Sequence, residues 1–563
     1  MAAEINRIYT VTDSAETFGG IDRSNGTPLG YWDKLCNMDM SAYPSVCTCA
    51  PFSYKELDEG ITGYTFFGGE IVYTKADGLY ISGEKTALSF SEGEKTLVVM
   101  GAQIVIFPDY IVVNTATEPY TVTSAVRERL TGRLYEYNQN QTRPTVSVYK
   151  LLYLDVAEND SALANYAVGD QVRLVWSYGG RERELTVSIS SVAKETYSAS
   201  GCVSVNFDTS ALSNTRYFYT EGRKMDRFRV PNIEGAYIEK PLPELDFVVQ
   251  HNNRLWGCSS KRHEIYCSKL GSALEWGKYD GISTDSWTAT VGSGGDFTGA
   301  CVYANSVLFF KENCVHVIYG TKASNFTIST IALRGVQKGS SGSLCESGGL
   351  LYYKAPEGIF SFNGSSSSRI DAKLDTDITD TAVACADGRY IIMLAKSGTA
   401  YYYDKRYGQW YTRLLNNAVS AHEINGRLYA VTKTDGKMKL VRLVGTEDGW
   451  DSFGGSDFLA VSGTLGRSAF YGIFKKLKLA LTRLKADSDT LKIGAYISCD
   501  NGGWKCVYES DDGNDELACG VTIPIRCRSV RLKICGELSG NAKLTLHGIY
   551  LDREKGSELS GKY

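Results

Sequence analysis

The fold is decided by a stretch that recurs along the chain, and its clearest copy is Val248–Leu270, with the sequence VVQHNNRLWGCSSKRHEIYCSKL. A small-residue turn at Asn252-Asn253 precedes an apolar strand, and a second turn then leads into an aromatic-rich strand. Four further segments share this pattern clearly and two earlier ones fit it: Cys301–Gly320, Leu344–Gly364, Val383–Asp404, Val419–Leu443, Tyr64–Gly83 and Leu97–Asn114. Because an all-strand repeat of roughly 40 residues is the signature of a β-propeller, we predict an all-β fold that contains a propeller of about seven blades.

The composition suits a chain of twisted strands and tight turns. Its 563 residues include 37 Tyr and 57 Gly but only 11 Pro, and tyrosine and glycine favour strands and turns respectively. The formal charge is −4, from 60 basic and 64 acidic residues. A general nucleic-acid clamp would carry a basic excess, so the charge argues against one but leaves open a surface past which DNA slides.

A longer interval separates the second and third copies of the repeat, and it has a strand pattern of its own. Four segments in it read as short strands: Val146–Val156, Tyr166–Val175, Leu185–Val192 and Cys202–Phe207. Loops at the rim of a rigid scaffold tolerate insertions. We therefore predict a small β-barrel inserted between two blades.

A polar, Gly-rich segment at 445–455 ends the repeats, and alternating apolar and polar residues follow it. Alternation of this kind predicts a separate antiparallel β-sandwich. The predicted order is an extended N-terminal arm at 1–55, the first part of the propeller at 56–120, the inserted barrel at 121–240, the second part of the propeller at 241–450, the sandwich at 456–551 and a mobile tail at 552–563.

No targeting or membrane segment is expected. Met1–Glu16 has no apolar run of the kind found in signal peptides, and no stretch approaches the roughly 20 apolar residues of a membrane-spanning helix. The chain has 15 cysteines, many of them at predicted strand positions where a reduced cysteine acts as a small hydrophobic residue. We expect reduced thiols in a cytoplasmic setting.

The sequence offers no candidate catalytic, cofactor-binding or metal-binding residue. We therefore expect no enzyme activity and no cofactor. The five histidines do not lie at metal-ligand spacing, and the chain lacks the usual nucleophile, phosphate-loop and zinc-protease motifs. The acidic loop Glu509–Glu516 leaves a Ca²⁺ site open, although a solvated turn explains it as well.

Several residues are expected to have structural roles. We predict that Trp256 and Trp276 anchor one blade and that Trp410 anchors another. The turn glycines are expected to adopt positive φ, where alanine costs on the order of 1 kcal/mol: Gly349, Gly388 and Gly426. Two arginines, Arg23 and Arg254, are candidates for inter-subunit or inter-blade pairs.

Three regions, at the N-terminus, in the middle of the chain and in the C-terminal domain, together resemble the tail nozzle proteins of short-tailed bacteriophages. They also resemble tail tubular-type propellers more widely. The motifs are Phe18–Arg23 with Asn37-Met38 and Tyr43-Pro44, then Asn253–Gly257 with Ile265–Gly271 and Trp276, then Val307–Tyr319 with Gly339-Ser340 and Gly348–Gly358, and finally Ser498–Trp504 with Pro524–Cys527. The resemblance implies a virion tail protein that is assembled in the host cytoplasm. It further implies a hexameric ring of identical subunits that contacts the portal or adaptor and other tail proteins or fibres. In such a ring double-stranded DNA passes through the channel without sequence-specific binding, and the ring helps to retain and then release the genome.

Two other functions stay open. A receptor- or glycan-binding propeller at the tail tip would need exposed aromatic residues, for which the densest cluster is Tyr401–Tyr403 with Tyr407, Trp410 and Tyr411. A glycosidase-type propeller enzyme is suggested by Ser498–Trp504, which resembles the Asp-box turn of sialidase propellers. A turn capped by a packed tryptophan explains that second motif equally well.

Overall fold

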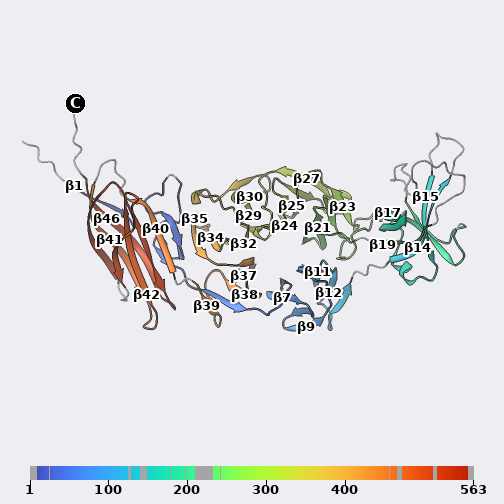
Figure 1. The fold of residues 1–563 in the computed structure, drawn as a ribbon, viewed down its shortest axis with the longest axis horizontal. Coiled ribbons are helices and arrows are strands. Elements are labelled where there is room, and N and C mark those ends of the chain that lie inside the picture. The colour runs from blue at the N-terminus through green and yellow to red at the C-terminus, as the bar shows by residue number, and fades with distance from the viewer. Residues whose placement is uncertain are drawn as a thin grey trace, which may run out of the picture. The chain divides into compact units, whose positions relative to one another are not determined.

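The computed structural model shows an almost entirely β-structured chain (Figure 1). It describes residues 9–24, 26–124, 129–139, 149–178, 180–196, 198–208, 233–240, 242–454, 457–465, 472–510 and 516–555. These ranges contain strands and four short 3-10 helices but no α-helix. The predicted all-β fold class is confirmed, with propeller sheets, an inserted barrel and a C-terminal sandwich.

The chain divides into two compact units. The first unit comprises Met1–Ile61, Phe310–Val315 and Ile331–Tyr563, and the second comprises Thr62–Phe309 and His316–Thr330.

The second unit holds four antiparallel sheets of the blade type, each with four strands in chain order. One sheet is β6 (Gly63–Phe67), β7 (Glu70–Lys75), β8 (Gly78–Ile81) and β9 (Glu84–Ala87), and the next is β10 (Thr96–Met100), β11 (Gln103–Phe107), β12 (Ile111–Asn114) and β13 (Thr121–Ser124). The third is β20 (Phe247–His251), β21 (Arg254–Ser259), β22 (Glu264–Cys267) and β23 (Trp287–Thr290). The fourth is β24 (Gly299–Tyr303), β25 (Ser306–Lys311), β26 (Cys314–Tyr319) and β27 (Thr327–Ala332), of which the β25–β26 hairpin at Phe310–Val315 belongs to the first unit.

Neighbouring blades of the second unit pack face to face. Ile104 of β11 shares a core with Val72 of β7, whereas the adjacent Val105 shares a core with Leu255 of β21. Trp256, which follows Leu255, lies in a third core with residues of β25. Successive side chains of a strand point to opposite faces, so the sheets that contain β11 and β21 are covered on both sides. This explains why the central strands of these two sheets read as continuous apolar runs rather than as alternating ones.

The inserted domain of the second unit is a closed barrel. Its six strands are β14 (Arg129–Gln139), β15 (Tyr149–Ala157), β16 (Gln171–Tyr178), β17 (Arg181–Ala193), β18 (Cys202–Phe207) and β19 (Ile233–Glu239), connected in the order β14-β15-β18-β17-β16-β19. Alternate residues fill its interior, among them Leu154, Leu174 and Val205.

The first unit holds three further sheets of the blade type. One is β28 (Cys345–Ser347), β29 (Leu350–Ala355), β30 (Gly358–Phe362) and β31 (Ser367–Arg369). Another is β32 (Ala382–Ala386), β33 (Tyr390–Ala395), β34 (Thr399–Asp404) and β35 (Gln409–Leu414), and the last is β36 (Ala418–Ile424), β37 (Arg427–Thr434) and β38 (Lys437–Arg442), joined by β5 (Phe52–Glu56) and β39 (Asp451–Phe453). The last blade is therefore completed by a strand from near the start of the chain.

Two sheets form the C-terminal sandwich of the first unit. One consists of β40 (Asp457–Leu465), β45 (Val530–Leu538), β42 (Leu491–Cys499) and β43 (Lys505–Ser510), continuous with β35 through β2 (Trp32–Cys36). The other consists of β3 (Met38–Asp39), β4 (Val46–Thr48), β46 (Lys543–Lys555), β41 (Gly472–Leu484) and β44 (Glu516–Cys527), with β1 (Tyr9–Ala15) beside β46.

The segment expected as an extended arm is built into these sheets. β1 pairs with β46 from Tyr9–Lys555 to Ala15–Ile549, β2 lies between β40 and β35, and β5 pairs with β38. Apolar residues such as Phe18 and Trp32 explain this placement, because they are buried there. The predicted tail also begins later than expected, since 552–555 extend β46, and the rest of that tail lies outside the described residues.

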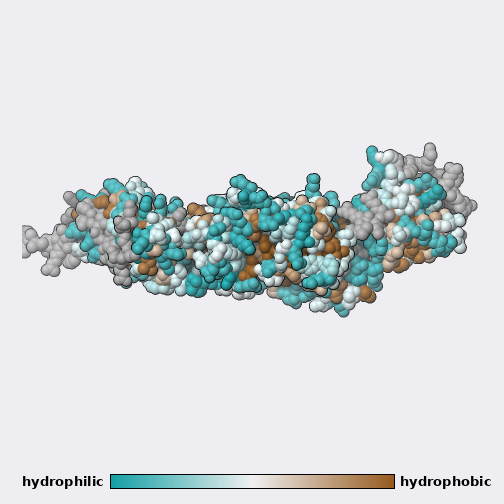
Figure 2. Space-filling model, turned by 90° about the horizontal axis from the view of Figure 1, so that it is seen from below, coloured by the Kyte–Doolittle hydropathy of each residue, from teal (hydrophilic) through white to brown (hydrophobic). Residues whose placement is uncertain are grey.

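The surface is mixed in character. On the face seen in Figure 2, hydrophilic residues dominate and hydrophobic ones occur in separate groups. Among the described residues, no helix has the length and apolar character needed to span a membrane.

Candidate functional site

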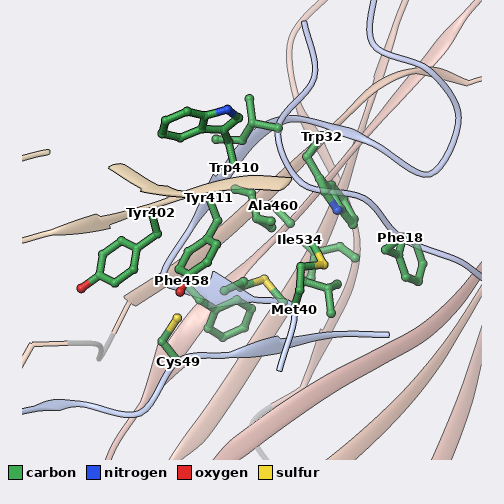
Figure 3. Close-up of a cluster of buried hydrophobic side chains, with 14 of the residues drawn as sticks. Phe18, Trp32, Met40, Cys49, Tyr402, Trp410, Tyr411, Phe458, Ala460 and Ile534 are labelled. Carbon is green, nitrogen blue, oxygen red and sulfur yellow. The ribbon is translucent and has the colours of Figure 1, made fainter. Parts of the chain in front are cut away.

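The N-terminal seam, which we define as residues 18–52, carries the first motif of the nozzle resemblance. Phe18 and Trp32 stack with 5.6 Å between their ring centroids. They share one core with Trp410 of β35 and Ile534 of β45 (Figure 3). The seam therefore fills the interior between a blade and the sandwich of the first unit.

Two glycines make this close packing possible. A Cβ on Gly19 would lie 2.1 Å from the ring of Tyr31, and a Cβ on Gly20 would lie 2.2 Å from the carbonyl oxygen of Trp410. The backbone N–H of Ile21 donates to that same carbonyl at 2.7 Å. Glycine is required at position 20 because two backbones approach each other directly there, and at position 19 because a Cβ would collide with the Tyr31 ring.

Arg23 is held inside the first unit. Its Nε donates to the carbonyl oxygen of Asp33 at 2.7 Å, and its Nη1 donates to that of Leu374 at 3.0 Å. Nε also lies 3.5 Å from the Asp33 carboxylate. Arg23 thus joins the seam to the connection before β32.

Arg254, a candidate for an inter-subunit or inter-blade pair, is buried within its own blade. Its guanidinium donates to the carbonyl oxygens of Ser268 (2.7 Å), Ser283 (2.9 Å) and Asp285 (2.7 Å), all of its own blade. Its contact with the next blade is the ring of Phe326, with 5.6 Å to the centroid, and not an ion pair. The cation closes its own blade because buried carbonyls need donors.

The three predicted tryptophans are buried. Trp256 lies in the core toward β25, and Trp276, from the connection between β22 and β23, lies in the core toward β11. The indole N–H of Trp276 donates to the carbonyl of Ala273 at 3.0 Å. These two residues therefore pack on opposite sides of one blade, and Trp410 packs in the core of the first unit.

The expected turn conformations hold at two glycines of three. Gly349 and Gly426 have φ of 74° and 76°. Gly388 does not have positive φ, so its prediction is wrong. The reason is local: the Asp387 carboxylate accepts from the N–H groups of Arg389 and Tyr390 at 2.7 and 2.5 Å, which shapes this turn from its first residue.

The aromatic cluster considered for glycan stacking belongs largely to the core. Tyr402, Trp410 and Tyr411 are buried, and the Tyr402 hydroxyl donates to the carbonyl of Leu443 at 3.1 Å. Tyr407 stacks on Tyr43 of the seam, with 4.2 Å between centroids. This cluster therefore offers little free ring surface.

The motif Ser498–Trp504 forms a turn between β42 and β43. Asp500 and Asn501 adopt positive φ, at 49° and 60°. The Asp500 carboxylate accepts from the N–H groups of Arg528 and Ser529 at 2.9 and 3.0 Å, so it ties two turns of the sandwich together. The motif is therefore a hydrogen-bonded turn, as expected, but its tryptophan, Trp504, is exposed rather than packed.

The described residues contain no group of three or more His, Cys, Asp or Glu side chains that could hold a metal ion. Most of the acidic loop Glu509–Glu516 lies outside the described residues, since 511–515 are not among them.

A cavity of about 290 Å³ opens beside the seam, within the first unit. Its lining combines charged, aromatic and glycine residues: Asp39, Ser41, Thr48, Cys49, Ala50, Pro51, Arg389, Tyr390, Tyr411, Arg413, Leu443, Val444, Gly445, Gly540, Asn541, Ala542 and Lys543. We call it the Arg413 cavity, after the buried cation of β35.

Two thiols approach Asp39, the carboxylate that lines this cavity, and one of them, Cys49, also lines it. Sγ of Cys47 lies 3.3 Å from Oδ1 of Asp39, and Sγ of Cys49 lies 3.7 Å from Oδ2. Burial, followed by the Asp39 charge, raises the pKa of Cys47 to about 11, and it raises the pKa of Cys49 well above the usual thiol value. Both thiols are therefore protonated near neutral pH and donate to Asp39.

Sequence reasoning missed the role of Arg413. The signal is its position two residues after Tyr411 in the same strand, which places both side chains on the same face. Alternation alone does not say that this face is the inner one, because the next residue, Leu414, is apolar and exposed.

No protein family model matches the chain, and no curated protein sequence matches it. Among solved structures the chain is similar to BamB from Moraxella catarrhalis, with 12% identity and a TM-score of 0.33 over 70% of this chain and 98% of that chain. It is also similar to Sqt1 from Saccharomyces cerevisiae, with 11% identity and a TM-score of 0.34 over 70% of this chain and 100% of that chain. An exo-beta-1,3-galactanase from Phanerochaete chrysosporium matches with 11% identity and a TM-score of 0.19 over 54% of this chain and 94% of that chain. Likenesses this distant carry no conclusion about function.

Proposed function

We propose that this chain is a structural protein of a bacteriophage tail. In this role it is a subunit of a nozzle-like ring, hexameric by the resemblance, that forms the DNA exit channel and helps to retain and then release the genome. The observation that supports the proposal is the N-terminal seam, because residues of the first resemblance motif, Phe18–Arg23, lock three parts of one unit together.

A conduit subunit needs rigidity more than it needs a reactive site. The seam supplies rigidity through backbone pairing, since β2 lies between β35 of a blade and β40 of the sandwich. This pairing must open before the blade and the sandwich of the first unit can separate. The strand that follows the seam, β5, completes the last blade between β38 and β39. Blades packed on both faces add further resistance to deformation.

The charge of the chain is compatible with the passage of DNA. At −4 over 563 residues, the subunit lacks the basic excess that would hold DNA by counterion release. The portal or adaptor, other tail proteins and the fibres are the proposed partners, and the virion tail is the proposed location.

The test is the composition of purified virions from the phage that encodes the chain. Mass spectrometry should find the chain in these particles, and electron microscopy of the tail should show it as a ring. Gly20→Ala, which disrupts the seam, should reduce its incorporation, whereas Gly388→Ala should not. Absence of the chain from virions that carry the wild-type gene would refute the proposal.

A second candidate, a receptor- or glycan-binding module at the tail tip, is favoured by one surface feature. Trp504 is exposed on the sandwich, with Arg531 and Lys533 at 5.8 and 5.2 Å from its ring. Exposed indole rings stack on sugars, and neighbouring cations favour anionic ones. Loss of cell-wall binding by Trp504→Ala, with Leu484→Ala as the control for another exposed apolar residue, would support this function in place of the first.

A further inference from the structure

We propose that the Arg413 cavity binds a small anion that carries a carboxylate or phosphate group. This goes beyond the proposed tail function and does not depend on it. The cavity lies in the first unit beside the seam, and positively charged side chains outnumber carboxylates three to one in its lining.

The main support for this site is the burial of Arg413 without a charged partner among the described residues. Its side chain is 5% exposed, and its Nη atoms donate to the carbonyl oxygens of Ala50 (2.6 Å) and Leu443 (3.4 Å). The guanidinium carbon lies 3.6 Å from the centroid of the Phe52 ring. These partners are neutral, and Nε has no hydrogen-bond partner in the part of the chain that the structure describes. A buried guanidinium is permanently charged, so an anion is the partner that compensates it best.

Two further cations line the cavity. Lys543, at the start of β46, makes no ion pair with the described residues. Arg389 pairs with Asp404 at 3.1 Å, but Arg406 pairs with the same carboxylate at 2.9 Å. One carboxylate thus serves two arginines, and a surplus of positive charge remains at this wall.

The single lining carboxylate is directed to other donors. Asp39 accepts from the N–H of Ser41 at 2.8 Å and from the thiols of Cys47 and Cys49. It therefore lowers the positive potential of the cavity without pairing with Arg413. An anion bound near Arg413 would be repelled by Asp39, so removing the Asp39 charge should tighten anion binding.

The size of the cavity sets the ligand class. About 290 Å³ is just below the range for small-molecule sites, roughly 300–1,000 Å³. This volume fits a short carboxylic acid or a phosphate better than a nucleotide. Arginine prefers such groups because its N–H donors match two oxygens at once.

The experiment is calorimetric titration of the full-length protein with succinate in one arm and inorganic phosphate in the other. We expect saturable binding of one or both, weakened about tenfold or more by Lys543→Gln, because a charged hydrogen bond is lost. Asp39→Asn should tighten binding severalfold, because a repelling charge is removed. Lys492→Gln, an exposed position on the same sandwich but outside the cavity lining, is the matched control and should bind as the wild type does.

The outcomes are decisive either way. Succinate binding without phosphate binding identifies a carboxylate site, and the reverse identifies a phosphate site. The proposal is overturned if the folded wild-type protein binds neither anion at millimolar concentration. It is equally overturned if binding is the same in Lys543→Gln and Asp39→Asn as in the wild type. Neither result bears on whether the chain is present in virions, so the tail proposal stands or falls separately.

Discussion

The substitution Gly20→Ala tests the seam directly. The added Cβ would lie 2.2 Å from the carbonyl oxygen of Trp410, and Cβ contacts under 3.0 Å essentially do not occur. The two backbones must therefore separate by about 0.8 Å. This movement breaks the 2.7 Å hydrogen bond from Ile21 N–H to Trp410 and the 2.9 Å bond from Gly20 N–H to Oε1 of Gln409.

The magnitude follows from these contacts. Two lost hydrogen bonds contribute about 1 kcal/mol each, and overpacking adds roughly 1–3 kcal/mol. We expect the seam to lose about 3–5 kcal/mol of local stability. Even a loss of 2 kcal/mol in local stability would raise the population of the locally open state roughly 30-fold.

Hydrogen exchange measured by mass spectrometry is the appropriate assay, since it reports the stability of each segment separately. Peptides covering 18–36 and 409–414 should lose protection in Gly20→Ala, while the barrel peptides should not change. Gly388→Ala is the control, because Gly388 has neither positive φ nor a neighbour within 4 Å of its added Cβ. Wild-type protection of 18–36 in Gly20→Ala would show that the seam does not depend on this contact.

Three further predictions concern stability. Gly349→Ala should lower the free energy of unfolding of the first unit by about 1 kcal/mol, because φ is 74°, whereas Gly388→Ala in denaturant titrations should be neutral or slightly stabilising. Burial lowers the pKa of His422 to about 4, below the value in the unfolded chain. The neutral imidazole therefore contributes its full stability above pH 6.5, and this contribution is lost as the pH falls toward 4. The free energy of unfolding of His422→Gln should depend less on pH between 6.5 and 4 than that of the wild type. Burial likewise lowers the pKa of Lys354 to about 8. The charged ammonium therefore opposes folding below pH 8, and this penalty is relieved between pH 8 and 10, so the free energy of unfolding should rise there. Lys354→Met should lose that rise; an unchanged rise would show that Lys354 does not cause it.

Local patterns were sufficient for much of the fold. The turn at Asn252-Asn253 predicts the β20–β21 hairpin because both asparagines adopt positive φ, at 48° and 55°. The strand at Cys202–Phe207 was predicted with the same bounds as the observed β18. Such elements are visible in a sequence because neighbours along the chain determine them.

Long-range pairing was not predictable from the same patterns. β5 falls at the end of the segment predicted as an extended arm, yet it completes a blade whose first strand begins at Ala418. The candidate site depends on the same kind of contact, because Arg413 meets Ala50 across 363 positions. Nothing in a single sequence indicates which distant strand edge a segment will find.

The position of β5 has a consequence for the time course of synthesis. Phe52–Glu56 leaves the ribosome early, but its partner β38 ends at Arg442. At about 5–20 residues per second, the ribosome needs roughly 20–80 s to make the residues between them. During this period β5 has an unpaired edge, which is prone to pair with other chains. Nascent chains of this protein should therefore need protection by chaperones until the last blade is complete, and chains truncated before β38 should aggregate.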